Sequence, residues 1–458
     1  MRKTLKWLSL TLIICVLLTA VFACSKSDDN AVEQPPAQNE GGDSSNGGDS
    51  GKKEPVKLIV WGGVPAENGP QDLVDAWNKA HPDIQVEYIR FVNDDTGNTK
   101  LDTALLAGEQ IDAYFSYGVP TMTKRIEGGM AEDLSSYGVD DFVKENIGEE
   151  GVFKYKDKLF SIPTTKEPAY MMINKSAFDE AGIEVPTEWT LDEFREIAKK
   201  LTKNADGKVR YGAYNAPDVA RMVLGDNYWY KNEGSESNFD DPAFKTNVQL
   251  YYDMMYTDNS TFPYSEVLAR KLQAYPQDVF LNQEVAMMVS SPWMLRYVNN
   301  TEEYPHEWIT TFAPLPVPEK GKEYYNAGSL NNWIMMNSKS QYKQETWEFM
   351  KYWATEGAAT YLLRAGKIPA WKNADPEAVA KGILGDNAEK LFDVDAFKRV
   401  ALDANLKYIV DTVTVAAPEI QQILKEEQDK LYLKEQTVDQ YIENVKKRAD
   451  EAIKNAAQ

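Results

Sequence analysis

After residue 54, short apolar runs alternate along the chain with segments that carry apolar residues at helical spacing. The run KLIVW at 57–61 has the length of a buried strand and ends in a glycine pair. PQDLVDAWNKA then places Pro70 where a helix would begin, and IQVEYI at 84–89 alternates like a half-buried strand. This strand-helix-strand order predicts an α/β fold with largely parallel sheets.

Three later segments have clear local patterns. Thr190 and Glu193 in TLDEFREIAKKL form a capping-box pattern before a helical apolar stripe. KQETWEFMKYWATEG predicts a second helix, with Gly357 as its stop. VAMMVSSPW predicts a buried strand over 285–289, with small serine side chains at its carboxyl end.

The first 54 residues predict export and membrane attachment. MRKTLKW is basic, the apolar run after it is too short for a spanning helix, and VFAC resembles a bacterial lipobox. We therefore expect a lipoprotein signal peptide at 1–23, a lipid on Cys24, and a flexible tether over 24–54. The mature chain would lie at the extracytoplasmic face of the cell membrane. An ordinary signal with a free Cys24 is the alternative.

Charge and length restrict the partners and the architecture. The formal net charge is −21, so nucleic acid and anionic lipid are disfavoured as partners, and membrane attachment has to be covalent. About 400 residues follow the tether, more than one hydrophobic core normally serves. We expect two lobes.

Motifs of catalysis and metal binding do not stand out. The sequence has no GxSxG, HExxH or P-loop spacing, and both histidines, His81 and His306, lie beside prolines. With 71 acidic residues, a glycosidase-like carboxylate pair stays possible by counting, but no local sequence marks one. We expect a binding protein that is not an enzyme and uses neither cofactor nor metal.

Aromatic residues stand at the ends of several predicted strands. Ligands of open α/β sheets bind outside the carboxyl ends of the strands, where Trp61, Tyr114, Tyr117 and Trp293 are expected. Sugars stack their C–H faces on such rings while their hydroxyls bond to polar groups. Each ring could instead fill a core.

The order of segments resembles a known family. KLIVWGG with HPDIQVEYI, KDKLFSIPTTKEPAYMMINKSAF, FLNQEVAMMVSSPWM and APLPVPEKGKEYYNAGSLNNWIMM are similar to the extracellular solute-binding lipoproteins of ABC importers, the family of maltose-binding protein. The resemblance implies two discontinuous α/β lobes of the type II periplasmic-binding-protein class. They would cover 55–166 plus 325–371, and 167–324 plus 372–458. A hinge would join them, with the ligand cleft between.

The resemblance also implies a function. The chain would capture a carbohydrate, an oligosaccharide above all, by hinge closure and deliver it as a monomer to the transmembrane subunits of an ABC permease. Its implied ligand residues fall into four groups. The first lobe contributes Trp61, Gly62, Gly63, Tyr114, Tyr117, Thr164, Thr165, Lys166 and Glu167. The second lobe contributes Tyr228, Trp229, Ser290, Ser291 and Trp293, the return crossing contributes Gly328, Ser329, Asn331 and Asn332, and Trp371 follows them.

Other functions stay open at this point. Family members also bind polyamines and glycerol phosphodiesters, and Lys166 and Arg296 are cations near the predicted cleft. A secreted lipoprotein acting on polysaccharide and a sugar-sensing protein are two further alternatives.

Overall fold

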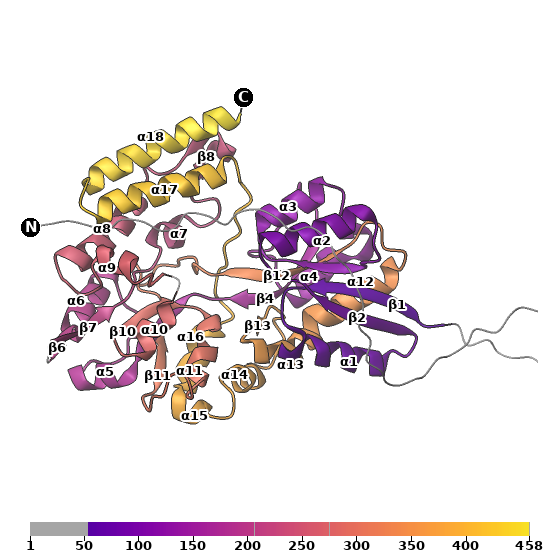
Figure 1. Ribbon diagram of the computed structural model, residues 1–458, viewed down its shortest axis with the longest axis horizontal. Coiled ribbons are helices and arrows are strands. Elements are labelled where there is room, and N and C mark those ends of the chain that lie inside the picture. The colour runs from indigo at the N-terminus through magenta and orange to yellow at the C-terminus, as the bar shows by residue number, and fades with distance from the viewer. Residues whose placement is uncertain (1–53, 206, 274, 458) are drawn as a thin grey trace, which may run out of the picture. The chain divides into compact units, whose positions relative to one another are not determined.

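Two mixed β-sheets organise the chain (Figure 1). The computed structural model describes residues 54–205, 207–273 and 275–457, so the predicted signal peptide, Cys24 and nearly all of the tether lie outside the described residues. The first sheet has the order β13-β4-β12-β3-β1-β2 and the second β11-β5-β10-β7-β6. The strands of the first sheet are β1 (Val56–Gly62), β2 (Ile84–Arg90), β3 (Ala113–Ser116), β4 (Ser161–Glu167), β12 (Ser329–Met336) and β13 (Ile368–Pro369). Those of the second are β5 (Tyr170–Asn174), β6 (Lys203–Ala205), β7 (Lys208–Ala213), β10 (Val285–Ser290) and β11 (Thr310–Ala313).

Helices pack around each sheet, with buried apolar side chains between. Around the first sheet are α1 (Pro70–Ala80), α2 (Asp95–Ala107), α3 (Val119–Glu127), α4 (Val139–Asn146), α12 (Lys343–Tyr352) and α13 (Ala358–Tyr361). The second lobe contains α5 (Lys175–Ala181), α6 (Leu191–Leu201), α7 (Val219–Leu224), α8 (Pro242–Tyr256), α9 (Tyr264–Ala269), α10 (Pro276–Leu281), α11 (Leu295–Asn299), α14 (Pro376–Leu384), α15 (Ala388–Leu391), α16 (Val394–Ala401), α17 (Ala417–Tyr432) and α18 (Val438–Ala456), and a small ribbon of β8 (Tyr230–Lys231) and β9 (Glu236–Ser237). Separate clusters of buried residues give each lobe its own core.

Most locally patterned elements form as predicted. β1, α1 and β2 make the expected unit with parallel strands, and Pro70 opens α1. Thr190 and Glu193 form the capping box of α6. β10 is largely buried and stops at Ser290, as its serines indicated.

The expectation of largely parallel sheets is wrong. β1 is parallel to β2 and β3, but β12 is antiparallel to both β3 and β4. In the second sheet, β5 is antiparallel to β10 and β11. The cause is the connectivity: β4 leaves the first sheet for the second and β12 comes back, so the return strand runs against its neighbours.

Gly357 does not stop a helix, contrary to prediction. It ends a π-helical stretch, Trp353–Gly357, that continues α12 into α13, and its own φ and ψ of −64° and −52° are helical. A Cβ at Gly357 would lie 2.8 Å from Leu73 Cδ1 of α1. The glycine therefore serves close packing between helices.

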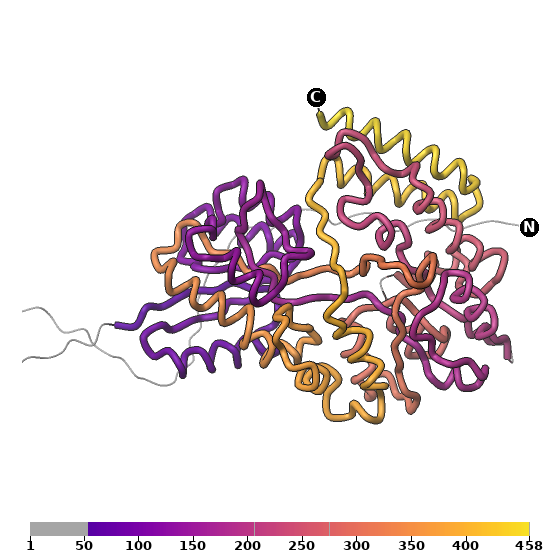
Figure 2. The backbone as a smooth tube through the Cα atoms, turned by 180° about the vertical axis from the view of Figure 1, so that it is seen from behind, coloured from indigo at the N-terminus to yellow at the C-terminus, as the bar shows by residue number. Residues whose placement is uncertain are grey.

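Three segments carry the chain between the two lobes: β4 runs into β5, β11 leads back into β12, and residues 370–375 connect β13 to α14. A further segment, residues 402–416, connects α16 to α17. Residues 402–416 form neither helix nor strand, and Figure 2 shows them as a long connecting stretch of backbone. This segment contacts the return crossing, because the N–H of Asn326 donates to the carbonyl of Lys407 at 2.8 Å.

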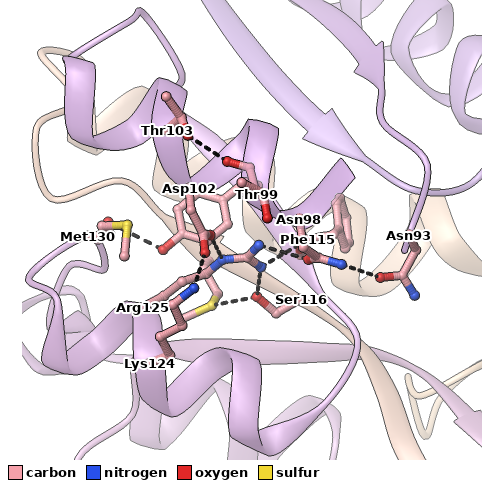
Figure 3. A network of polar contacts seen from close by, with 12 residues as sticks. Asn93, Asn98, Thr99, Asp102, Thr103, Phe115, Ser116, Lys124, Arg125 and Met130 are labelled. Atoms are coloured by element: carbon pink, nitrogen blue, oxygen red, sulfur yellow. Dashed lines mark hydrogen bonds and ion pairs between the residues drawn. The ribbon is translucent and has the colours of Figure 1, made fainter. Parts of the chain in front are cut away.

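A buried arginine fixes the helices at the carboxyl end of β3. Arg125 of α3 is fully buried, and its Nε donates to Asp102 of α2 at 2.8 Å (Figure 3). Its other nitrogens donate to Ser116 Oγ at 2.6 Å and to Asn98 Oδ1 at 2.9 Å. Lys124 donates to the second oxygen of Asp102 at 2.8 Å, but its side chain is 69% exposed. The network joins α2, α3 and the residue before Tyr117.

We expect Arg125→Met to lower the free energy of unfolding by about 3–5 kcal/mol, because Asp102 keeps its charge in a buried site without its buried partner. Lys124→Met is the matched control, since it removes an exposed partner of the same carboxylate and should cost about 1 kcal/mol or less. Urea denaturation of the two variants and the wild type measures the difference. Equal losses would show that the buried pair has no special weight.

The same carboxylate predicts a pH dependence. Burial acts to raise the pKa of Asp102, but hydrogen bonds from Lys124 and Arg125 outweigh it and hold the pKa below its ordinary value of 3.8. A depressed pKa in the folded state gives stability that is present above pH 3.8 and is lost as the pH falls through the folded value. Asp102→Asn should therefore be less stable than wild type at neutral pH, and the gap should narrow below pH 3.8 in urea titrations.

Candidate functional site

A cavity of about 710 Å³ is lined by residues of both lobes and of the crossing segments. The first lobe contributes Tyr117 and the start of α3, and β12 contributes its first half. The second lobe contributes the end of α7 and the loop before β8, while residues 409–414 and the first turn of α17 close the cavity. Five of the predicted ligand residues meet here: Tyr117, Tyr228, Trp229, Ser329 and Asn331.

Tyr117 is positioned by Gly63, the residue that directly follows β1. The backbone N–H of Gly63 donates to Tyr117 Oη at 2.5 Å, and a Cβ at Gly63 would lie 2.9 Å from the same oxygen. Gly63 therefore has to be a glycine for Tyr117 to stand where it does. Burial raises the pKa of Tyr117, so its hydroxyl keeps its proton and remains a donor at neutral pH.

The second lobe presents three aromatic residues in a row. Tyr228 stacks on Phe244, with ring centroids 5.7 Å apart and planes at 11°. Trp229 is half-buried and packs against Phe239 at 6.2 Å, and Tyr230 donates to the carbonyl of Val415 at 2.9 Å. These contacts fix the three rings along one side of the cavity, and we call Tyr228, Trp229 and Tyr230 the aromatic wall.

Hydrogen bonds connect the aromatic wall and its neighbouring residues to residues 402–416. Arg221 of α7 donates to Asp411 Oδ2 at 2.6 Å, and the N–H of Asn227 donates to Asp411 Oδ1 at 2.8 Å. Asn227 Oδ1 in turn accepts from the N–H groups of Thr412 and Val413 at 2.6 and 2.8 Å. Arg221 also lies over the Tyr228 ring, 5.3 Å from its centroid.

A second cavity, of about 440 Å³, lies at the carboxyl ends of β7 and β10. Trp293 lines it, half-buried and edge-on to Tyr297 at 6.0 Å, and Ser290 lines it as well. Asn215 after β7 accepts from the N–H of Val289 at 2.7 Å. The two cavities share a wall, because Tyr228 of the first donates to Asp218 of the second at 3.3 Å. Burial raises the pKa of Asp218.

Several predicted ligand residues lie in the core instead. Tyr114 is fully buried and donates to the carbonyl of Met130, and Trp61, opposite it on β1, is 7% exposed. The central strands β1 and β3 are covered on both faces, so their rings have no open side. Also enclosed are Gly62 beneath the Tyr88 ring and the buried side chains of Thr164, Thr165 and Asn332. Gly328 is half-buried and packs against the Glu167 backbone.

Lys166 and Trp371 line a different cavity from the other predicted ligand residues. In β4 and β12 Lys166 pairs with Leu330 and Thr165 with Asn331, so side-chain alternation puts Lys166 on the face opposite Asn331. There, a third cavity of about 290 Å³ is lined by Lys166 and Trp371. Burial lowers the pKa of Lys166.

Two further predicted residues line none of these three cavities. Glu167 makes an ion pair with Lys367 at 2.8 Å, and Ser291 lies between Ser290 and Trp293 without lining the second cavity. For both residues a ligand role stays a prediction.

Sequence reasoning missed part of the site. Arg221 and Asp411 are 190 residues apart, and no local pattern connects them. Tyr230 and the first turn of α17 also escaped notice. Tyr214 and Asn215 could have been found, because they directly follow β7 and obey the rule applied to the other strand ends.

Neither a metal centre nor a membrane span is found in the part of the chain that the structure describes. Within those residues, no three His, Cys, Asp or Glu side chains are grouped as metal ligands would be. No helix among them is long and apolar enough to cross a bilayer.

Known proteins resemble both the sequence and the fold. An uncharacterized lipoprotein of Streptomyces antibioticus is 28% identical over 156 residues, 31% of this chain and 31% of its own length. A sugar transporter structure from Rhizobium etli, in an open conformation, has a TM-score of 0.70 at 20% identity and covers 86% of this chain and 99% of its own. A cyclic alpha-maltosyl-1,6-maltose binding protein from Arthrobacter globiformis has a TM-score of 0.67 at 17% identity, covering 88% and 100%.

The fold is thus the two-lobed architecture of periplasmic-binding-protein-like solute-binding proteins. The family described as bacterial extracellular solute-binding protein matches residues 65–360, more than half of the chain. The chain belongs to the bacterial extracellular solute-binding protein family.

Proposed function

We propose that this protein is the substrate-binding component of an ABC importer and captures a carbohydrate, specifically an oligosaccharide, between its lobes. The observation that carries the proposal is the cavity of about 710 Å³, which combines an aromatic wall with hydroxyl and amide groups. Trp229 offers an apolar face to sugar C–H groups, and Ser329 and Asn331 offer hydrogen bonds to hydroxyls. The Rhizobium structure is named as a sugar transporter and the Arthrobacter structure as a cyclic alpha-maltosyl-1,6-maltose binding protein, and both names support the same class.

Ligand binding would act through the crossings. Because the cavity is lined from both lobes, a ligand that touches both walls favours the closed arrangement. β4, β12 and residues 370–375 are the hinge segments in this proposal, with the lobes divided as the sequence predicted. A permease could then distinguish the loaded protein from the empty one, and a lipid on Cys24 would hold a monomer at the extracytoplasmic face of the membrane. The Streptomyces lipoprotein relative is consistent with that anchor.

We expect at least one oligosaccharide to stabilise residues 54–458 in a thermal-shift screen. A ligand at 100 times its Kd that binds only the native state adds about 2.7 kcal/mol to the free energy of unfolding. The panel should include mono- and oligosaccharides, a polyamine and a glycerol phosphodiester. A shift with one of the latter two and none with any sugar would contradict the carbohydrate proposal. Turnover of a glycan by the purified protein alone would instead favour the enzyme alternative.

Replacement of single tryptophans locates the site. Trp229→Ala should weaken oligosaccharide binding about tenfold or more, because it removes the apolar platform of the wall. Trp371→Ala is the matched control, since Trp371 lines the cavity on the opposite face of the crossing strands and should leave the affinity unchanged. Trp293→Ala tests the second cavity in the same way. Calorimetric titration with the sugar found in the screen gives the three values, and an equal loss in Trp229→Ala and Trp371→Ala would contradict the assignment.

A further inference from the structure

The charged side chains that line the cavity of about 710 Å³ are already engaged by the protein. They are Lys124, Glu127, Arg221 and Asp411, two of each sign. Lys124 pairs with Asp102 at 2.8 Å and Glu127 accepts from Tyr155 Oη at 2.9 Å. Arg221 pairs with Asp411 at 2.6 Å. A ligand therefore meets no cation in this cavity that lacks a carboxylate partner.

From this arrangement we infer that the site selects uncharged oligosaccharides, and that Asp411 is the residue that rejects anionic ones. The inference rests on the proposed carbohydrate function and narrows its ligand class. Of the two cations that line the cavity, Arg221 is the one that contacts the aromatic wall, since its guanidinium lies over the Tyr228 ring. Asp411 neutralises that guanidinium, so a sugar carboxylate would have to displace Asp411 or remain unpaired beside it.

The second cavity strengthens the same selection. Its charged lining residue is Asp218, a carboxylate, and the amides and hydroxyls around it suit neutral hydroxyl groups. An anionic sugar reaching from one cavity into the other would approach this carboxylate too. The net charge of −21 adds a weak long-range repulsion of anions.

The geometry allows the charge of Asp411 to be removed with little change of shape. In Asp411→Asn, the remaining carbonyl oxygen can still accept the N–H of Asn227, while Arg221 loses its ion-pair partner. Asp226→Asn is the matched control. Asp226 lies in the loop after α7, next to Asn227, and accepts the N–H of Val410 at 2.7 Å, but it makes no ion pair with any residue that the structure describes. The two variants change the net charge equally, and only one frees a cation.

The experiment is calorimetric titration with paired neutral and uronic-acid trisaccharides, such as maltotriose, mannotriose, trigalacturonate and triglucuronate. Wild type should bind a neutral trisaccharide and prefer it to every uronate. In Asp411→Asn, the ratio of uronate to neutral affinity should rise about tenfold or more, as expected for a new charge-assisted hydrogen bond. The gain should shrink as ionic strength rises, because it is electrostatic. Asp226→Asn should keep the wild-type ratio, and Arg221→Gln/Asp411→Asn should lose the gain.

The outcomes separate the two proposals. A uronate that wild type binds as tightly as any neutral sugar overturns the selection for uncharged ligands but leaves the carbohydrate function standing. A folded Asp411→Asn with an unchanged ratio overturns the role of Asp411. Binding of none of the sugars overturns both proposals. Should Asp411→Asn fail to fold, the wild type still decides the ligand class, because binding to a neutral sugar should be insensitive to salt and binding to a uronate should not.

Discussion

The pairing of β4 with β12 is the contact on which the rest of the arrangement depends. These strands carry the chain from one sheet to the other and back, and their register runs from Ser161 opposite Met335 to Glu167 opposite Ser329. Because alternate residues face opposite ways, the register decides which polar groups line the interlobe cavity and which line the cavity behind it. A shift by one residue would turn the side chain of Asn331 to the opposite face of the strand pair. The selectivity of the site thus depends on a backbone ladder as much as on its side chains.

Local patterns in the sequence were sufficient wherever the determining contacts are local. The capping box of α6, Pro70 at the start of α1 and the serines that end β10 act within a few residues, and all three were predicted correctly. Strand direction was predicted wrongly because it is set by connectivity across more than 150 residues. Gly357 was misinterpreted for a related reason: the feature that requires a glycine there is Leu73, on another helix.

The candidate site shows the same limit. Placing aromatic residues at strand ends brought Tyr117 and Trp293 to cavities, but it brought Trp61 and Tyr114 to the core. The last two lie within central strands that are covered on both faces, whereas Tyr117 comes just after its strand and Trp293 lies beyond Pro292. Among these four residues, an aromatic side chain lines a cavity only when its residue lies beyond the end of the strand. Position relative to the last paired residue is therefore more informative than the presence of an aromatic residue alone.

Asn331 and Asn332 illustrate how neighbouring residues of one type acquire different roles. Asn331 keeps a regular position opposite Thr165 and lines the cavity. Asn332 has a φ of +49° and is missing from the ladder, which resumes at Trp333, and its carbonyl accepts instead from Thr164 Oγ1 at 2.8 Å. Asparagine tolerates the left-handed region better than most residues, so this irregular position has a backbone reason. The ladder between β4 and β12 is interrupted at one residue, and the side chain at the interruption turns inward, where it is 2% exposed and out of reach of a ligand.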